Sequence, residues 1–278
     1  MEQFGGSENY NNRLDSKFLL QPISWAGGSS WGTGQDEAFD AFIRASSEIE
    51  MYDALTGREP MGRGIFTMPD MMKYPYQMND PEKVYMDIRE KVHNLFGFNK
   101  DTLTFLGGDH SISIPILDAY MDKFPDLTVV HFDAHADVRS SYDGNKYSHA
   151  CSMYRATKRT RVMPVGVRSG TRDEMGMLQN PTMAKRGYIV DDEIYKLTNK
   201  HPVYISVDMD VLDPGIFPAT GTPEPGGLTW FELISFLETV MVDKWVVGFD
   251  IVEFSPKKGF TAYDVMVAKL YYKMLGYL

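Results

Sequence analysis

The chain has 278 residues, of which 43% are hydrophobic and 24% charged, and its formal net charge is −10. This length and hydrophobic content suffice for one well-buried core, so we expect a single domain over residues 1–278. The negative charge argues against nucleic acid and anionic membranes as partners, because both attract basic patches, and it suits a small cationic substrate.

The first 17 residues are polar and lack the apolar segment of a secretory signal, and we expect them to form a loose N-terminal arm. No apolar run reaches the roughly 20 residues that span a bilayer. The single cysteine, Cys151, cannot form an intrachain disulfide. These features favour the reducing cytoplasm as the location of the protein.

After this arm, short apolar runs alternate with helical patterns. The apolar runs predict strands at Phe18–Ile23, Thr102–Leu106, Leu127–Phe132, Arg161–Val165, Gly187–Val190, Val203–Val207 and Trp245–Phe249. The helical patterns predict helices at Asp36–Glu48, Pro81–Leu95, Ser111–Lys123, Ser148–Thr157, Trp230–Val240 and Ala262–Leu275. Thr229 and Glu232 predict a capping box at the start of one helix. Alternating strands and helices are typical of an α/β sandwich with a mostly parallel sheet, which binds ligands beyond the carboxyl ends of its strands.

The first polar cluster, Gly-Gly-Asp-His at residues 107–110, follows the strand predicted at Thr102–Leu106. The two glycines would permit a sharp turn. His110 would then stand at the exit of the strand. A single histidine at a strand end is more often structural than a metal ligand, so this cluster alone leaves both interpretations open.

The second cluster places Asp133, His135 and Asp137 at alternate positions after the strand predicted at Leu127–Phe132. Alternate residues of an extended segment point to the same face, so the three side chains should converge. A polar strand end is the alternative interpretation. Burying three such groups without a cation would be costly, and we therefore favour a metal site.

The third cluster places Asp208 and Asp210 on one face after the strand predicted at Val203–Val207. Two neighbouring carboxylates repel each other unless a cation lies between them. The three clusters combine two histidines with four aspartates, and such mainly hard donors suit manganese or magnesium. Two divalent ions would balance the four aspartates, and a hydroxide would bring the site to a charge of about −1, which suits a cationic substrate.

Five motifs in this chain resemble the signatures of the ureohydrolases, the family of arginase, agmatinase and related amidinohydrolases. They are Gly-Gly-Asp-His-Ser at 107–111, Asp-Ala-His-Ala-Asp at 133–137, Ser-Val-Asp-Met-Asp-Val-Leu-Asp-Pro at 206–214, Gly-Thr-Pro-Glu-Pro-Gly-Gly-Leu-Thr at 221–229 and Gly-Phe-Asp-Ile-Val-Glu-Phe-Ser-Pro at 248–256. The resemblance implies a three-layer α/β/α sandwich whose central parallel sheet has about eight strands. It also implies a homo-oligomer, either a trimer or a hexamer.

The resemblance further implies two Mn²⁺ ions and the residues that hold them. One ion would be held by His110, Asp133, Asp137 and Asp208, and the other by Asp133, His135, Asp208 and Asp210. Asp133 and Asp208 would therefore bridge the ions. A hydroxide between the ions would attack the guanidinium carbon of the substrate, and Asp137 would pass a proton to the departing amine.

Three residues outside the metal clusters gain roles from the same resemblance. Glu253 would bind the guanidinium through charge-assisted hydrogen bonds, unless it is a surface glutamate at a strand end. His149 would shuttle protons or contact the substrate, and a pKa near ~6.5 suits that task; a solvated histidine at a helix start is the alternative. Thr222 would contact the substrate or serve as a turn residue.

Within the family, the chain is most similar to the archaeal type of agmatinase. Arginases carry asparagine where this chain has Arg139, and they carry an acidic pair after a Gly-Leu-Arg turn, where residues 169–171 here are Ser-Gly-Thr. We therefore expect hydrolysis of agmatine to putrescine and urea, a step of polyamine biosynthesis. N1-aminopropylagmatine, guanidinobutyrate and arginine are alternative substrates.

Other protein classes fit the sequence less well. A metallophosphatase would carry a Gly-Asn-His-Glu segment, and a deacetylase of related fold would carry a His-His pair; neither occurs in the chain. A catalytically inactive regulatory homologue is disfavoured by the complete set of six metal-ligand residues. Measured manganese content would separate such a homologue from an enzyme.

Overall fold

The computed structural model describes residues 2–9, 12–72, 80–97, 102–178, 196 and 198–278. Within this part of the chain, the strands are β1 (Phe18–Ile23), β2 (Ile65–Thr67), β3 (Thr102–Gly107), β4 (Thr128–Phe132), β5 (Arg161–Val165), β6 (Val203–Asp208) and β7 (Val246–Val252). They form one sheet in the order β2-β1-β3-β7-β6-β4-β5, and all pairings are parallel. The fold is therefore the expected α/β sandwich.

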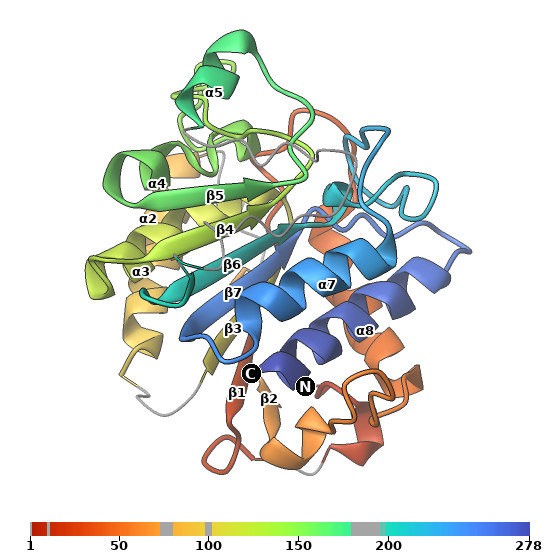
Figure 1. Ribbon diagram of the computed structural model, residues 1–278. Helices are drawn as coiled ribbons and strands as arrows, with labels where there is room; N and C mark the ends of the chain where they lie inside the picture. Colours follow the sequence, from red (N-terminus) through yellow and green to blue (C-terminus); the bar gives the residue numbers. More distant parts are fainter. Residues whose placement is uncertain (1, 10–11, 73–79, 98–101, 179–195, 197) are drawn as a thin grey trace.

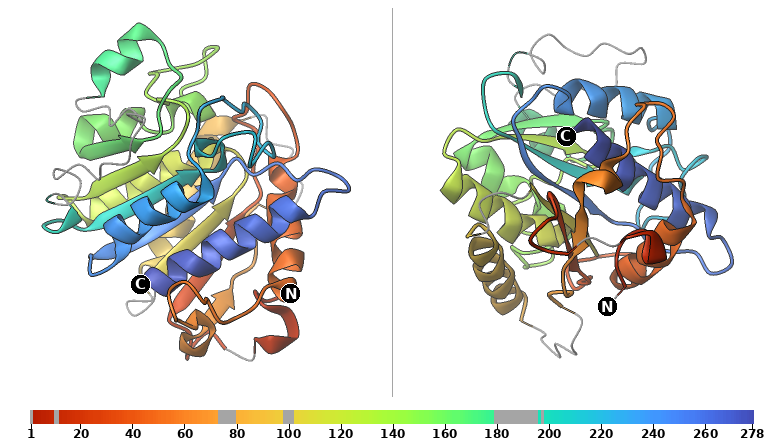
Figure 2. Two further views of the ribbon diagram at one scale, coloured as in Figure 1. Left: turned by 45° about the vertical axis from the view of Figure 1, so that its right-hand side comes forward. Right: turned by 90° about the horizontal axis from the view of Figure 1, so that it is seen from below.

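Helices cover both faces of this sheet (Figures 1 and 2). One face carries α2 (Pro81–Leu95), α3 (Ser113–Lys123) and α4 (Tyr154–Arg159), and the other carries α1 (Ala38–Ala45), α7 (Trp230–Met241) and α8 (Ala262–Tyr277). The short α5 (Arg172–Met177) lies beyond the β5 edge of the sheet (Figure 1). Among the described residues, no helix combines the length and the apolar content that a membrane span requires.

The buried strands explain why the apolar runs contain no polar alternation. In β6, Val203, Ile205 and Val207 pack into the core under α7 and α8, whereas Tyr204 packs into the core on the opposite face. A parallel sheet that is covered on both faces needs apolar side chains at odd-numbered and at even-numbered positions of each strand, since these point to opposite faces. The two cores hold the strands rigidly and so fix the positions of the loops that follow them.

Most predicted elements are confirmed, with small shifts at their ends. The capping box is present, because Thr229 Oγ1 accepts from the backbone N–H of Glu232 and the Glu232 carboxylate accepts from that of Thr229. The helix predicted at Ser148–Thr157 is instead a 3₁₀ turn at His149–Cys151 followed by α4. The sequence analysis missed β2 and α5, and the strand predicted at Gly187–Val190 lies outside the described residues.

The prediction of a loose arm over residues 1–17 is wrong for its first part. Phe4 is fully buried and packs against Phe42 and Tyr271, and its backbone N–H donates to Thr67 Oγ1 at 3.0 Å. One buried aromatic side chain anchors this polar segment, since such a ring removes a large apolar area from water. Leu14, by contrast, is 94% exposed.

Candidate active site

The candidate residues meet at the carboxyl edge of the sheet because β3, β7, β6 and β4 are neighbours. His110 follows β3, Asp133 follows β4 and Asp208 is the last residue of β6. Parallel strands end at the same edge, so side chains far apart in sequence are brought together there.

The chain bends at Gly108 and Asp109 as expected, and the two glycines before His110 also serve close packing. Neither Gly107 nor Gly108 has a positive φ. A Cβ on Gly108 would lie 1.9 Å from the carbonyl oxygen of Trp25, so only glycine fits. Asp109, the next residue, accepts from the backbone N–H of Gly28 at 2.7 Å and ties the Gly-rich loop to the end of β3.

His110 lies in the centre of a carboxylate cluster. Its Nδ1 lies 3.1 Å from Asp133 Oδ2 and 3.3 Å from both Asp137 Oδ2 and Asp208 Oδ2. The imidazole is fully buried, and Nδ1 has no hydrogen-bond partner among the described residues. Four potential ligand atoms from three strand ends thus surround one small space.

The partners of His110 fix which nitrogen faces this space. Ser206 Oγ donates its hydrogen to Asp250 Oδ1 at 2.7 Å, so it accepts from His110 Nε2, which lies 3.0 Å away. The neutral imidazole therefore carries its hydrogen on Nε2, and its Nδ1 lone pair faces three carboxylate oxygens. Such an arrangement requires a cation, and orienting partners of this kind are common behind metal-binding histidines.

The spacing of these atoms also fits a metal ion. A hard divalent ion bound at about 2.1 Å from its ligands places two ligands at right angles about 3.0 Å apart. The distances of 3.1–3.3 Å from His110 Nδ1 to the carboxylate oxygens are close to this value.

A second group of ligand atoms adjoins the first. His135 Nδ1 lies 2.9 Å from Asp210 Oδ2 and 3.6 Å from Asp133 Oδ1. Asp133 therefore presents Oδ2 to the His110 group and Oδ1 to the His135 group, which is the position of a bridging carboxylate. Asp208 presents Oδ2 to His110, while its Oδ1 accepts from the backbone N–H of Asp210.

The pKa values reflect the crowding of negative charge. Burial, together with Asp210 and Asp133, raises the pKa of Asp208 well above its usual range. Burial would lower the pKa of His135, but Asp133 and Asp210 raise it to about 12. Both shifts arise from carboxylates that lie close together in a buried place, an arrangement whose negative charge a bound cation would balance.

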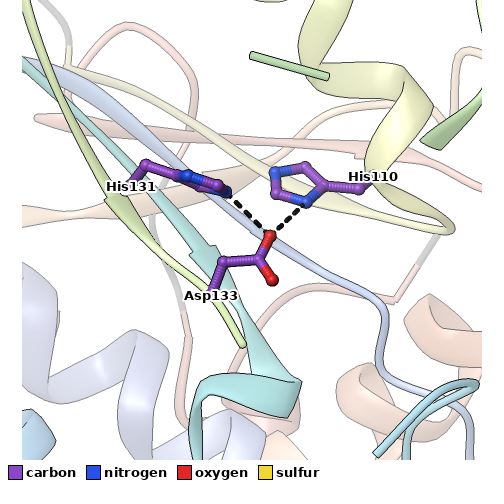
Figure 3. A group of neighbouring side chains, drawn as sticks. All are labelled: His110, His131 and Asp133. Atoms are coloured by element: carbon purple, nitrogen blue, oxygen red, sulfur yellow. Dashed lines mark hydrogen bonds and ion pairs between the residues drawn. The ribbon is translucent and has the colours of Figure 1, made fainter. Parts of the chain in front are cut away.

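The sequence analysis missed His131, which lies within β4 and is fully buried. Its Nε2 lies 2.7 Å from Asp133 Oδ2, opposite His110 (Figure 3). This contact holds the carboxylate that faces both ligand groups. The alternation of Asp133, His135 and Asp137, extended two residues backward, would have pointed to it.

Glu253 and His149 lie beside the ligand cluster. Glu253 Oε1 accepts from the backbone N–H of His110 at 2.9 Å and lies 3.6 Å from His149 Nδ1. Glu253 is buried, with 5% exposure, so it is not a surface glutamate. Burial would lower the pKa of His149, but Glu253 and Asp137 raise it to about 9, so the imidazole is a cation at neutral pH.

Backbone strain is concentrated at two of these residues. Asp137 has a φ of 52° and Glu253 a φ of 61°. Residues with a Cβ rarely enter this region, and where they do the site is often functional.

A cavity of about 350 Å³ opens over the cluster. Its lining includes Ser30, His135, Asp137, Arg139, His149, Glu174 and Thr222. The acidic side chain of Glu174 reaches this cavity from α5. Residues 169–171, where arginases carry an acidic pair, are Ser-Gly-Thr in this chain. The structure thus brings Thr222 and His149 to the same space as the ligand cluster.

Comparisons with known proteins agree with this arrangement. A family model described as the arginase family matches residues 16–276. An N(1)-aminopropylagmatine ureohydrolase of Synechocystis is 30% identical over 99% of this chain and 94% of that protein. An agmatinase of Pyrococcus horikoshii is 36% identical over 73% of this chain and 71% of that protein. The crystal structure of agmatine ureohydrolase of Thermoplasma volcanium superposes with a TM-score of 0.84 at 31% identity, covering 99% of this chain and 94% of that one.

Proposed function

The chain belongs to the arginase family of hydrolases, and we propose that it cleaves the guanidinium group of agmatine to putrescine and urea with two Mn²⁺ ions. The observation that carries this proposal is the buried cluster of carboxylates and histidines around His110 and Asp133, whose members His135 and Asp137 also line the cavity. We assign the first ion to His110, Asp133, Asp137 and Asp208, and the second to Asp133, His135, Asp208 and Asp210. When bound, the ions would lower the pKa of a shared water so that it can attack the guanidinium carbon at neutral pH.

The protein's own side chains supply binding and proton transfer. Glu253 remains anionic beside His149 and accepts N–H groups of the guanidinium. Asp137, which lies both in the ligand cluster and at the cavity wall, carries the proton of the attacking water to the departing amine nitrogen. His149 exchanges protons with the substrate or with water in the cavity. Thr222, which lines the same cavity, contacts the substrate.

The rim of the cavity supports agmatine over arginine. Arg139 is the only lysine or arginine among the described lining residues, and it could in principle bind the α-carboxylate of arginine. It is occupied, because its Nε lies 3.2 Å from Glu174 Oε1 and its guanidinium stacks over Tyr142 at 4.8 Å. Glu224, whose Oε1 lies 3.9 Å from His135 Nε2, adds negative charge nearby. An α-carboxylate would therefore lose hydration without gaining a donor.

N1-aminopropylagmatine is the second candidate substrate, because relatives of that name match most of the chain at 30–34% identity. Its additional amine adds a cation, which the acidic rim would tolerate. Guanidinobutyrate, like arginine, carries a carboxylate and is disfavoured for the same reason.

A substrate panel tests the proposal directly. With manganese present, urea release is measured from agmatine, aminopropylagmatine, guanidinobutyrate and arginine. We expect kcat/KM for agmatine to exceed that for arginine by at least ~10²-fold, since a site that lacks the right polar partners can discriminate by ~10⁴. Equal values would refute the agmatinase assignment, and a higher value for aminopropylagmatine would favour the second candidate.

We also propose a cytoplasmic homo-oligomer, either a trimer or a hexamer. The location is supported by the single cysteine, Cys151, which is buried and unpaired. The oligomer follows only from the family resemblance, and the mass of the purified protein in solution tests it.

A further inference from the structure

The carboxylate of Glu253 has a defined partner for each oxygen. Oε1 accepts from the backbone N–H of His110 at 2.9 Å, and Oε2 accepts from the side-chain Nε2 of Gln35 at 3.1 Å. Gln35 lies 218 residues earlier in the chain, at the start of the 3₁₀ turn Gln35–Glu37, and is only 1% exposed. No motif used in the sequence analysis contains this residue.

The local packing is built around this contact. Ser255 Oγ donates to the carbonyl oxygen of Thr33 at 2.7 Å, which ties the loop before Gln35 to the segment after β7. A Cβ on Gly221 would lie 2.8 Å from Gln35 Nε2 and 3.7 Å from Glu253 Oε2. Glycine at 221 therefore leaves the space in which the amide reaches the carboxylate.

The chemistry of an amide suits this position. A lysine or arginine at 35 would neutralise Glu253 and compete with a cationic substrate for its oxygens. A neutral N–H donor orients the carboxylate and leaves its charge intact. Gln35 Oε1 has no hydrogen-bond partner among the described residues, so the bond to Glu253 is what sets the orientation of the amide.

We propose that Gln35 is a positioning residue that holds Glu253 Oε2, so that the free lone pairs of the carboxylate face a guanidinium group in the cavity. The strained backbone of Glu253, at a φ of 61°, places the carboxylate, and the bonds from His110 and Gln35 fix its rotation. The inference rests on the proposed function in one respect, namely that Glu253 binds the guanidinium.

The variant Gln35→Met keeps the length of the side chain and removes the donor. Guanidinium ion at millimolar concentration serves as the probe, and its binding to the manganese-loaded protein is measured by calorimetry. We expect about tenfold weaker binding, the size of one hydrogen bond to a charged group, and a similar rise in KM for agmatine with a smaller change in kcat. Manganese content and the inhibition constant of putrescine, which lacks a guanidinium, should not change, and the protein should stay fully folded at the assay temperature although its melting temperature falls slightly.

A double-mutant cycle separates positioning from a general structural effect. In a Glu253→Ala background, Gln35→Met should have no further effect on guanidinium binding, because nothing is left to position. The control is Glu37→Gln, an exposed change two residues further on that forms no side-chain cap and should behave as wild type.

The outcomes distinguish this inference from the proposed function. Wild-type guanidinium binding in Gln35→Met, combined with loss of binding in Glu253→Ala, overturns the role of Gln35 alone. A loss of manganese or of thermal stability in Gln35→Met that accounts for the weaker binding also overturns it. A wild-type protein that releases no urea from any guanidino compound overturns the proposed function, while guanidinium binding still tests Gln35.

Discussion

Two clusters of buried and half-buried carboxylates in this molecule differ in the side chains that balance their negative charge. The helix cluster, on α2, α3 and α4, consists of Asp118 and Asp122 with Arg89, Arg155 and Arg159. Asp118 lies 3.0 Å from Arg155 Nη1 and 2.9 Å from Arg159 Nη1, and Asp122 contacts Arg159 and Arg89. Burial would raise the pKa of Asp122, but these arginines hold it below its usual value.

In the strand-end cluster, which consists of Asp133, Asp137, Asp208 and Asp210, no side chain of a described arginine or lysine pairs with a carboxylate. The ion pairs described for these four residues are all with histidines. Burial and Asp133 raise the pKa of Asp210, the opposite of the shift at Asp122. The comparison indicates that the carboxylates paired with arginine serve the structure of the protein. The carboxylates paired only with histidines lie beside the cavity, where metal cations could balance their charge.

The largest effect should follow removal of a carboxylate from the strand-end cluster. Asp208→Ala should abolish urea release and lose at least one manganese ion, because we assign the residue to both ions and its Oδ2 lies 3.3 Å from His110 Nδ1. Asp133→Ala should do the same. Metal analysis of the purified variants checks this, and two ions still bound in Asp208→Ala would contradict the assignment.

The matched control lies in the helix cluster. Asp122→Asn removes a charge that arginines already balance, so it should retain two ions and normal turnover. Its cost in stability should be ~0–1 kcal/mol, as for most surface ion pairs. Loss of manganese in Asp122→Asn would contradict the conclusion that only the strand-end cluster binds metal.

A smaller effect is expected at His149, which lies at the cavity but outside both ligand groups. If it moves protons, His149→Ala should lower turnover by roughly 10²–10⁴-fold with manganese content unchanged. Turnover and metal content are measured on the same preparation. Wild-type turnover would leave His149 a purely structural neighbour of Ser30 and Glu253.

The sequence predicted the fold well because both cores are built from apolar runs that are easy to recognise. It failed at β2, which has three residues, and at Phe4, whose single ring anchors a polar segment. Short elements and single anchors are stabilised by tertiary contacts, and these leave little trace in local composition.

The candidate site was predictable to the extent that its residues occur in periodic clusters. Asp133, His135 and Asp137 announce a shared face by their spacing. His131 belongs to the same series, but its neighbours in sequence are apolar, so the pattern predicts a strand residue there and not a site residue. Gln35 and Glu174 come from separate loops or helices, and only the fold brings them to Glu253 and Arg139.

The smallest expected difference between the two clusters concerns pH, because only the histidines of the strand-end cluster should make manganese binding depend on it. Burial would lower the pKa values of His110 and His135, but the aspartates raise both, to about 12 for His135. A raised pKa favours the protonated imidazole, and an imidazole that carries a proton must release it to bind an ion. Because binding releases protons, a higher pH favours it. Apparent manganese affinity should therefore increase about tenfold per pH unit for each displaced proton and fall as the pH is lowered.

Calorimetry in buffers of different ionisation enthalpy counts the protons that are released when manganese binds. His93 provides the control: its Nε2 lies 3.3 Å from Oδ2 of Asp122, a member of the helix cluster, and His93→Gln should leave the count unchanged. A count of zero in the wild type would mean that the histidines of the strand-end cluster do not exchange protons for metal, and the distinction between the two clusters would then fail.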